Sequence, residues 1–253
     1  MQQSLYTAAV GMNTQQARID TIANNIANVQ TAGYKADRVD FKDALYQSMK
    51  SPVLEDGIEN NLLVGSGALV ASVSTDFEQG SFLETGQMFD FAIAGSGFFA
   101  LRDRDGRILY TRSGSFQAAP MEDGLYLAAQ NGALVLDENL EPIRLPEGGV
   151  RVEEDGTMYG GAGEAVGRLG LFGFANPKGL SKAGETAFEE TAASGPAMVE
   201  TGGKVIQGSL EQSNVNLGEE LTQLIRSQRA YALMSRALST TDDMMGLANT
   251  MHG

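Results

Sequence analysis

Apolar side chains recur at seven-residue spacing near the start of the chain. One column consists of Leu5, Met12, Ile19 and Ile26, and a second, three positions on, consists of Ala8, Gln15, Ile22 and Val29. These columns match the a and d positions of a helix that packs along another helix. Asn28, Thr31 and Gly33 supply a stop, and Gly33 is suited to a left-handed cap. The pattern predicts a long N-terminal helix with a narrow apolar stripe.

The same spacing recurs near the end of the chain. The first column consists of Leu217, Leu224, Tyr231, Leu238 and Met245, the second of Leu221, Gln228, Ser235 and Asp242, and Ile225 and Ala232 widen the stripe. Asn216, followed three residues later by Glu219, resembles a helix N-cap with its capping-box partner. We therefore expect a second helix, and the two heptad helices are good candidates for pairing with each other.

A plainer interpretation is that both segments are ordinary amphipathic helices packed on a central domain, since such stripes are common. Two features argue against it. Both stripes are narrow, and the sequence between them is of a different, β-rich type.

The middle of the chain reads as short strands separated by tight turns. Apolar runs flank Asp105-Gly106, Asn131-Gly132 and Asp155-Gly156, which are strong hairpin signals. Further expected strands are Ala68–Val73, Phe91–Ala94 and Leu169–Phe174. This spacing suggests an antiparallel sandwich or irregular barrel. Between this region and the first helix we expect a helical stretch at Phe41–Met49 and an extended or flexible one at Ser51–Gly67.

The predicted fold class is α+β, with paired, coiled-coil-like terminal helices flanking a central antiparallel, mostly β domain. The predicted division is an N-terminal helix at 1–35, a connector at 36–67, a central β domain at 68–207 and a C-terminal helix at 208–253.

Charge follows the same division. The 253 residues include 32 acidic and 18 basic side chains, a net charge of −14. Residues 51–204 carry 10 basic and 23 acidic groups (10 − 23 = −13), while residues 1–50 carry 5 − 4 = +1 and residues 205–253 carry 3 − 5 = −2. A chain this acidic is a poor candidate for general nucleic-acid binding, which depends on neutralising phosphates.

Composition also argues against most catalytic chemistry. The chain has no cysteine and a single histidine, His252, so thiol nucleophiles, His-dependent triads and His-rich metal sites are not expected. Gly95-Ser96-Gly97-Phe98-Phe99-Ala100 fits a dinucleotide-binding pattern, but a strand rather than the required helix follows it. Gly202-Gly203-Lys204 lacks the upstream glycine and the Ser/Thr of a phosphate loop.

Two acidic groupings are better explained by structure than by chemistry. Asp103 and Asp105 lack the glycine and glutamate positions of a calcium loop, and Glu153-Glu154-Asp155 fits a charged sheet edge. We expect no catalytic residue, metal, cofactor or small-molecule substrate. The sequence also shows neither a cationic secretory leader nor about 18 consecutive apolar residues, so we expect a soluble protein whose export would use a route without a cleaved signal.

Two terminal segments resemble a known family. Asn24-Asn25-Ile26-Ala27-Asn28-Val29-Gln30-Thr31-Ala32-Gly33-Tyr34 follows the pattern N-N-x-A-N-x-x-T-x-G-[FY], and Gly208–Leu217 with Gln228-Arg229-Ala230-Tyr231 forms a second match. They resemble the terminal signatures of the bacterial flagellar rod and hook axial proteins. A weaker match, at Phe91–Phe99 and Tyr110–Phe116, is similar to the β domain of that family. Within the family, the length and the connector look most like the distal rod protein, with a proximal rod or related hook-basal-body paralogue as the alternative.

The resemblance implies a structural subunit rather than an enzyme. Such subunits polymerise helically into the basal-body rod in the periplasm or cell-wall space, with the helices inside the tube and the β domain outward, transmit torque to the hook and support motility. The implied partners are further copies of the chain, other rod and hook axial proteins, the flagellar type III export apparatus and, where the host has an outer membrane, bushing or ring proteins.

The terminal stripes and signatures together indicate an assembly interface. Its expected members are Leu5, Met12, Ile19, Ile22, Asn24, Asn25, Ile26, Asn28, Gly33, Tyr34, Asn214, Leu217, Leu221, Leu224, Ile225, Tyr231 and Leu238. The asparagines would supply amide hydrogen bonds between neighbouring helices, and surface solvation is the alternative account of them. Two other functions stay open: a carbohydrate- or peptidoglycan-acting protein, and a monomeric module whose terminal helices dock a partner.

Overall fold

The computed structural model describes residues 2–44, 47–48, 63–64, 67–146, 148–161, 163–184 and 186–250. It divides into two compact units, each built from several segments of the chain. The helical unit consists of Met1–Ala27, Asp37–Ser74 and Asn216–Gly253, and the β unit of Asn28–Ala36 and Thr75–Val215.

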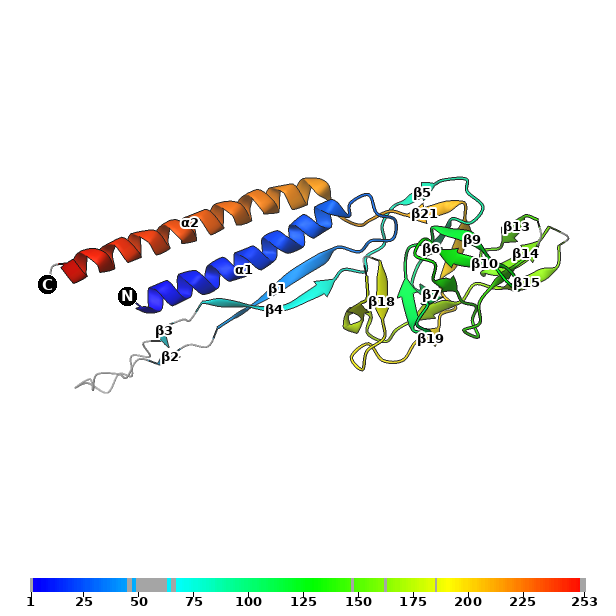
Figure 1. Cartoon of the computed structure of the whole chain (residues 1–253), viewed down its shortest axis with the longest axis horizontal. Coiled ribbons are helices and arrows are strands. Elements are labelled where there is room, and N and C mark those ends of the chain that lie inside the picture. The colour runs from blue at the N-terminus through cyan, green and yellow to red at the C-terminus, as the bar shows by residue number, and fades with distance from the viewer. Residues whose placement is uncertain are drawn as a thin grey trace. The chain divides into compact units, whose positions relative to one another are not determined.

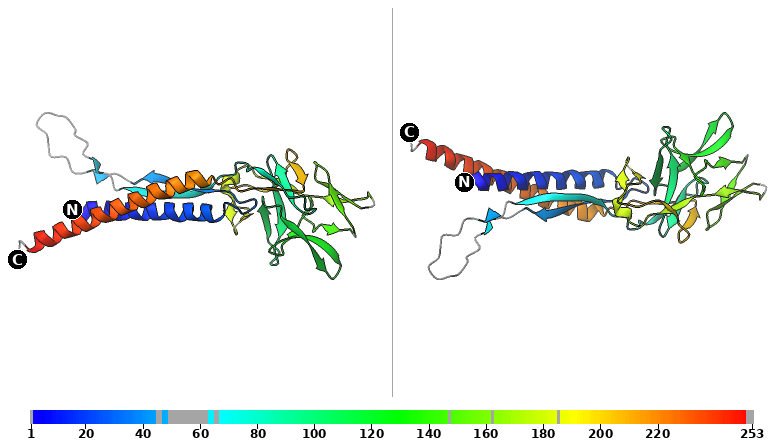
Figure 2. Two further views of the ribbon diagram at one scale, coloured as in Figure 1. Left: turned by 90° about the horizontal axis from the view of Figure 1, so that it is seen from above. Right: turned by 90° about the horizontal axis from the view of Figure 1, so that it is seen from below.

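Two long helices form most of the helical unit. Helix α1 spans Gln2–Ala27 and helix α2 spans Leu217–Thr250, and they lie side by side (Figures 1 and 2). Asn216 caps α2 as the sequence predicts, because its Oδ1 accepts hydrogen bonds from the backbone N–H groups of Gly218 and Glu219 at 3.1 and 3.3 Å. Helix α1 ends at Ala27, before Val29 of the predicted column.

A two-stranded sheet completes the helical unit and corrects one prediction. Strand β1, Asp37–Asp43, pairs with β4, Ala68–Thr75, so the helix expected from Phe41 is wrong at Phe41–Asp43. The alternation of Val39 and Phe41 was the available strand signal. A short pair, β2 (Gln47–Ser48) and β3 (Leu63–Val64), follows. The expected helix at Phe41–Met49 is therefore also wrong at Ala44 and at Gln47–Ser48. Its other residues, and most of the stretch expected at Ser51–Gly67, lie outside the described residues.

The β unit is built from short antiparallel strands. Their bounds are β5 Phe82–Glu84, β6 Phe91–Ala94, β7 Phe98–Arg102, β8 Ile108–Thr111, β9 Phe116–Met121, β10 Gly124–Ala129, β11 Leu134–Val135, β12 Arg144–Leu145, β13 Val150–Val152, β14 Thr157–Gly160, β15 Ala165–Arg168, β16 Leu171–Gly173, β17 Ser181–Lys182, β18 Ala187–Glu189, β19 Met198–Val199, β20 Lys204–Gln207 and β21 Ser209–Glu211. A 3-10 turn, Pro177–Gly179, lies between β16 and β17.

The strands form one large sheet and several smaller ones. The main path of the ten-stranded sheet runs β12-β10-β11-β7-β8-β18-β17, and β9, β16 and β19 join it from the side. Strands β13, β14 and β15 form a three-stranded sheet, while β20 pairs with β6 and β21 with β5. The α+β class and the central antiparallel β region are as the sequence predicts (Figure 1).

The three predicted hairpin turns are confirmed. Their glycines, Gly106, Gly132 and Gly156, have φ of +79°, +83° and +86°, a region that side chains with a Cβ avoid. The turns connect β7 to β8, β10 to β11 and β13 to β14. In each hairpin the dipeptide ending in glycine fixes the position of the turn.

Aromatic side chains from several strands fill the core of the β unit. Phe91, Phe99 and Phe116 belong to one buried cluster, in which the rings of Phe99 and Phe116 pack edge to face with centroids 5.3 Å apart. A second cluster contains Phe98, Tyr110 and Phe188, among others. The Gly-x-Gly segment at Gly95–Gly97 lies between β6 and β7, so no helix follows it.

Candidate assembly interface

Helices α1 and α2 pack antiparallel in a register fixed by three contacts. Arg18 Nη2 donates to Gln223 Oε1 at 2.9 Å, and Asn25 Nδ2 donates to Glu220 Oε1 at 3.1 Å. Nearer the start of α1, Gly11 lies against Met234, whose sulfur would be 2.9 Å from a Cβ at position 11. Positions along α1 therefore rise as those along α2 fall, and the predicted pairing of the terminal helices is present in one chain.

Small and polar side chains dominate the contact between the two helices. Thr14 is buried in α1, and its hydroxyl donates to Gly11 O at 2.7 Å, so this buried donor has a hydrogen-bond partner. Ser227 is buried in α2. Small residues let helix backbones approach closely, which explains why the face between the helices is less apolar than a coiled-coil seam.

The predicted N-terminal stripe lies partly in this contact. Ile22 is 4% exposed and is the most buried member of the stripe. Leu5, Met12, Ile19 and Ile26 are half-buried. The N-terminal column is thus shielded along its length, but only Ile22 is fully enclosed in the single chain.

The second column predicted on α2 is wrong for the contact inside the chain. Leu221, Gln228, Ser235 and Asp242 are exposed, and the column one position earlier is turned inward: Glu220, Ser227, Met234 and Thr241. The physical reason is that small and polar residues such as Ser227 occupy part of the inner face, beside half-buried Leu224 and Leu238, so apolar content marked that face only in part. The signal that could have found it is Ser227, a small residue seven positions from Met234 and opposite a glycine-containing helix.

Several large apolar side chains of α2 are uncovered as a result. Leu217, Leu221 and Ile225 are 44%, 44% and 51% exposed, and their spacing of four residues places them on one stripe of the helix. We call these three residues the α2 apolar stripe. Tyr231 is also exposed, while Leu224 and Leu238 are half-buried.

The predicted asparagines have different surroundings. Asn25 is buried and joins three elements, because its Nδ2 donates to Asp37 O and Glu220 Oε1 while its Oδ1 accepts from Asp37 N. Asn214 accepts from Ala36 N at 2.8 Å.

The two other asparagines bond elsewhere or lie at the surface. Asn28 accepts from the hydroxyl of Thr31, and Asn24 is exposed. Asn25 makes a hydrogen bond between neighbouring helices of the kind that the sequence predicts.

Gly33 and Tyr34 lie in the β unit rather than at the end of a helix. Gly33 has φ +72°, and a Cβ there would lie 2.3 Å from the backbone nitrogen of Ser113. Its N–H donates to Glu211 O at 2.7 Å. Tyr34 is buried, with Lys182 Nζ 4.9 Å from the centre of its ring. Gly33 thus serves a close backbone approach to Ser113 and not the helix cap that the sequence suggested.

A buried ionic cluster follows these residues, and sequence analysis did not find it. Lys35 Nζ lies 2.6 Å from Glu211 Oε1, and Arg112 Nη1 lies 3.5 Å from Glu211 Oε2, with side-chain exposures of 0%, 5% and 0% for Lys35, Arg112 and Glu211. Burial lowers the pKa of Lys35 and that of Arg112, and Glu211 opposes both changes. The cluster ties the segment after α1 to strand β21.

Glu220 has a titratable carboxyl in the contact between the two helices. Burial raises the pKa of its carboxyl above 4.5, against the opposing effects of the hydrogen bond from Asn25 and the charge of Arg18. Among the described residues, no group of three or more His, Cys, Asp or Glu side chains is placed to hold a metal ion. None of the helices that the structure describes has an apolar stretch long enough to cross a membrane.

Three family models match successive parts of the chain. The model described as flagella basal body rod protein matches residues 5–35, and the flagellar hook protein FlgE/F/G D1 domain matches residues 92–160. The model of the flagellar basal body rod FlgEFG protein C-terminal matches residues 206–251. The matches cover most of α1, part of the β unit and all of α2.

Whole proteins give the same result. The chain is 37% identical to the flagellar basal-body rod protein FlgG of Borreliella burgdorferi over 99% of both chains, and 36% identical to FlgG of Buchnera aphidicola over 96% of both. It is 33% identical to the flagellar hook-basal body complex protein FlhP of Bacillus subtilis, over 99% of this chain and 100% of that protein. The resemblance read from the terminal motifs is confirmed, and the chain belongs to the family of flagellar basal-body rod proteins of the FlgG type.

Proposed function

We propose that this chain is a structural subunit that self-assembles helically into the basal-body rod, as the distal rod type, and transmits torque to the hook. The observation that carries the proposal is identity of 35–37% to several proteins named FlgG, over 96% or more of each chain. The role is structural rather than enzymatic, and it supports motility.

The α2 apolar stripe supports a polymer. Burying a leucine or isoleucine side chain stabilises a contact by about 1.5–3 kcal/mol, yet Leu217, Leu221 and Ile225 stay exposed in the single chain. We propose that further copies of the chain bury this stripe. We propose that the other predicted interface residues on α1 and α2 also act in assembly, because they build the helix pair that carries the α2 apolar stripe.

Partners and location follow from the family and are part of the proposal. The rod subunit contacts other rod and hook axial proteins at the ends of its own segment, and ring or bushing proteins where the host has an outer membrane. It reaches the periplasm or cell-wall space through the flagellar type III export apparatus, without cleavage of a signal peptide.

A proximal rod or related hook-basal-body role is the second candidate. One observation favours it: the chain is 32% identical to FlgG of Bacillus subtilis and 33% identical to FlhP of the same organism. The distal type is preferred because FlgG proteins of several other organisms are 33–37% identical over nearly the full length.

Leu221→Asp tests the polymer directly. The side chain is exposed in the single chain, so the variant should fold with an unchanged helical circular-dichroism signal. A carboxylate in an apolar contact between copies is costly, and cells that carry the variant in place of the original chain should lack complete rods in electron micrographs.

The matched control is Ala237→Asp, which adds the same charge at an exposed position about 160° around the same helix from Leu221. It should leave rods intact. Normal rods in cells with Leu221→Asp would contradict the assignment of the stripe to the polymer contact.

A further inference from the structure

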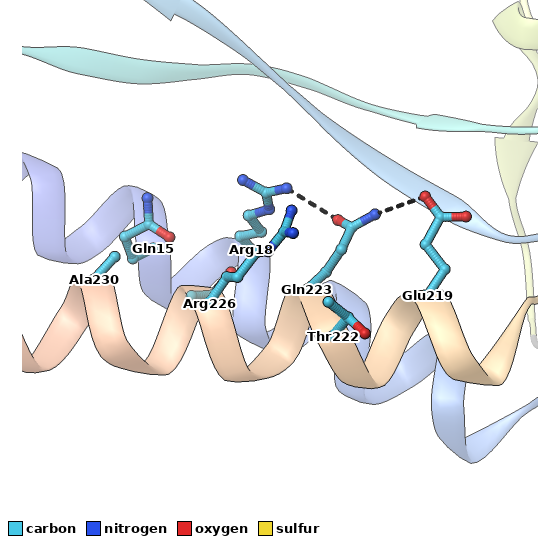
Figure 3. A pocket seen from close by; sticks show the side chains of 8 residues that line it. Gln15, Arg18, Glu219, Thr222, Gln223, Arg226 and Ala230 are labelled. Atoms are coloured by element: carbon cyan, nitrogen blue, oxygen red, sulfur yellow. Dashed lines mark hydrogen bonds between the residues drawn. The ribbon is translucent and has the colours of Figure 1, made fainter.

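An open groove with a volume of about 550 Å³ follows the junction of α1 and α2. Its lining includes Gln15 and Arg18 from α1, and Thr222 and Arg226 from α2 (Figure 3). The two arginines therefore bring two positive charges to one groove from different helices.

The groove also contains one carboxylate, that of Glu219, so its lining carries a net charge of 2 − 1 = +1. Arg18 donates to the amide oxygen of Gln223, and its guanidinium carbon lies 6.0 Å from the centre of the Phe41 ring. Glu219 and Glu220 accept hydrogen bonds from Gln223 and Asn25 instead.

Among the described residues, no carboxylate oxygen lies within 4.0 Å of a guanidinium nitrogen of Arg18 or Arg226. Two guanidinium groups of like charge in one groove favour a carboxylate, which each can bind through paired hydrogen bonds.

An unpaired acidic pair lies farther along α2. Asp242 and Asp243 are exposed, and the positions three and four residues away on either side carry no basic side chain. Within the described residues neither aspartate makes an ion pair.

The aspartates lie where the helix pair ends. In the antiparallel pair, Gly11 faces Met234 and Asn25 faces Glu220. In both pairs the two residue numbers add to 245, which gives the residue of α2 that is level with any residue of α1. Gln2, the first described residue of α1, is therefore level with about residue 243, and α2 continues from there to Thr250.

The position of Asp242 relative to Arg226 indicates contact between copies. The two residues are 16 positions apart on α2, which corresponds to about 24 Å along the axis and about 160° around it. They therefore face nearly opposite sides of one helix. A contact between unlike surfaces on opposite sides repeats without closing into a dimer, as a helical polymer requires.

We propose that the groove containing Arg18 and Arg226 binds the carboxylates of Asp242 and Asp243 from a second copy of this chain. Neighbouring copies joined by this contact are displaced by about 24 Å along α2. The inference rests on the proposed function and names the charged contact within the polymer.

The test uses charge reversal in cells that lack the original gene copy. Arg226→Glu and Asp242→Arg should each fold, because neither residue has an ion-pair partner within the described part of its own chain. Each variant alone places like charges in the contact, and complete rods should fall by at least about tenfold. The matched control Arg236→Glu reverses the charge of an exposed arginine of α2 that does not line the groove, and it should keep rods at the original level.

Coexpression of the two single variants gives the decisive result. The glutamate introduced into the groove of an R226E chain then meets the arginine introduced into a D242R chain. Arg226 in the groove of the D242R chain meets Asp242 of the R226E chain. Opposite charges meet at both contacts, so an alternating polymer restores rods to within about twofold. Normal rods with either variant alone, equal loss with Arg236→Glu, or no restoration on coexpression would each overturn the inference. If the original chain itself fails to restore rods to these cells, the proposed function fails and the inference fails with it.

Discussion

Gly33 holds a position that other residues cannot take without strain. Its φ of +72° lies in the left-handed region, and a Cβ would lie 2.3 Å from Ser113 N. The same residue was conspicuous in the sequence as part of a terminal motif, but the reason for glycine there is a contact with a distant loop. A motif can therefore mark a position correctly while the local pattern suggests the wrong physical cause.

Gly33→Ala should lower the free energy of unfolding of the β unit by more than the cost of placing alanine in a left-handed backbone conformation. Alanine in that region costs about 1–2 kcal/mol, and the clash with the Ser113 backbone adds roughly 1–3 kcal/mol. The control is Gly106→Ala, since Gly106 has φ +79° and a Cβ at that position would have no heavy atom within 4 Å. Denaturant unfolding followed by tyrosine fluorescence measures both variants, and equal losses would contradict the steric role of Gly33.

Glu211 is the carboxylate that pairs with two buried cations, Lys35 and Arg112. Glu211→Gln would leave Lys35 and Arg112 without their carboxylate, and removing one partner of a buried ion pair costs about 3–5 kcal/mol. The control is Glu154→Gln, because Glu154 forms its 2.7 Å pair with Lys204 at the exposed surface and such pairs contribute little. A loss of stability in Glu211→Gln no greater than in Glu154→Gln would show that the buried cluster does not hold the β unit together.

At the scale of elements, the α1–α2 contact contains a carboxylate whose charge is disfavoured. Because burial raises the pKa of Glu220 above 4.5, the folded state binds more protons than the unfolded state between 4.5 and that raised pKa. Stability therefore falls as the pH rises through this window. The charge of Glu220 costs stability at neutral pH and costs nothing below 4.5.

Glu220→Gln should accordingly stabilise the helix pair at neutral pH, with the difference vanishing at and below about pH 4.5. Glutamine keeps the oxygen that accepts from Asn25. Glu219→Gln is the control: it removes a charge from the same first turn at an exposed position and should be neutral or slightly destabilising. Unfolding followed by the helical circular-dichroism signal measures both, and a Glu220→Gln variant less stable than the original at neutral pH would contradict the account.

Elements with strong local signals could be predicted from the sequence, and elements that depend on distant partners could not. The hairpins at Gly106, Gly132 and Gly156 follow from turn chemistry, and the helices follow from heptad spacing. Strand β1 pairs with β4, which begins at Ala68, so its partner lies about 30 residues away and local periodicity was too short to identify it. The inner face of α2 was predicted only in part, because Leu224, Leu238 and Met245 of the first predicted column are half-buried, whereas small and polar residues such as Ser227 take the place of the second column.

At the scale of the whole molecule, each unit is built from segments that are far apart along the chain. Residues 28–36 belong to the β unit, and Asp37–Ser74 belongs to the helical unit, whereas the sequence suggested four consecutive regions. Strand β20 places Lys204 opposite Ala94, and β21 places Ser209 opposite Glu84. The buried Lys35–Glu211 pair likewise joins residues 176 positions apart, a proximity that composition and periodicity do not encode.

The distribution of charge has a physical counterpart in these units. Residues 51–204, which carry the −13 described above, supply most of the β unit, whereas the terminal segments that form α1 and α2 are nearly neutral. Neighbouring helices in a polymer repel one another less when they carry little net charge. The pattern suits a subunit that packs through its helices.

The central claim is that the chain builds the basal-body rod, and electron microscopy of basal bodies from cells that lack it tests this most directly. The account predicts rods that stop short and carry no hook, with full rods restored when the original chain is supplied again. Complete rods bearing hooks in the absence of the chain would contradict it.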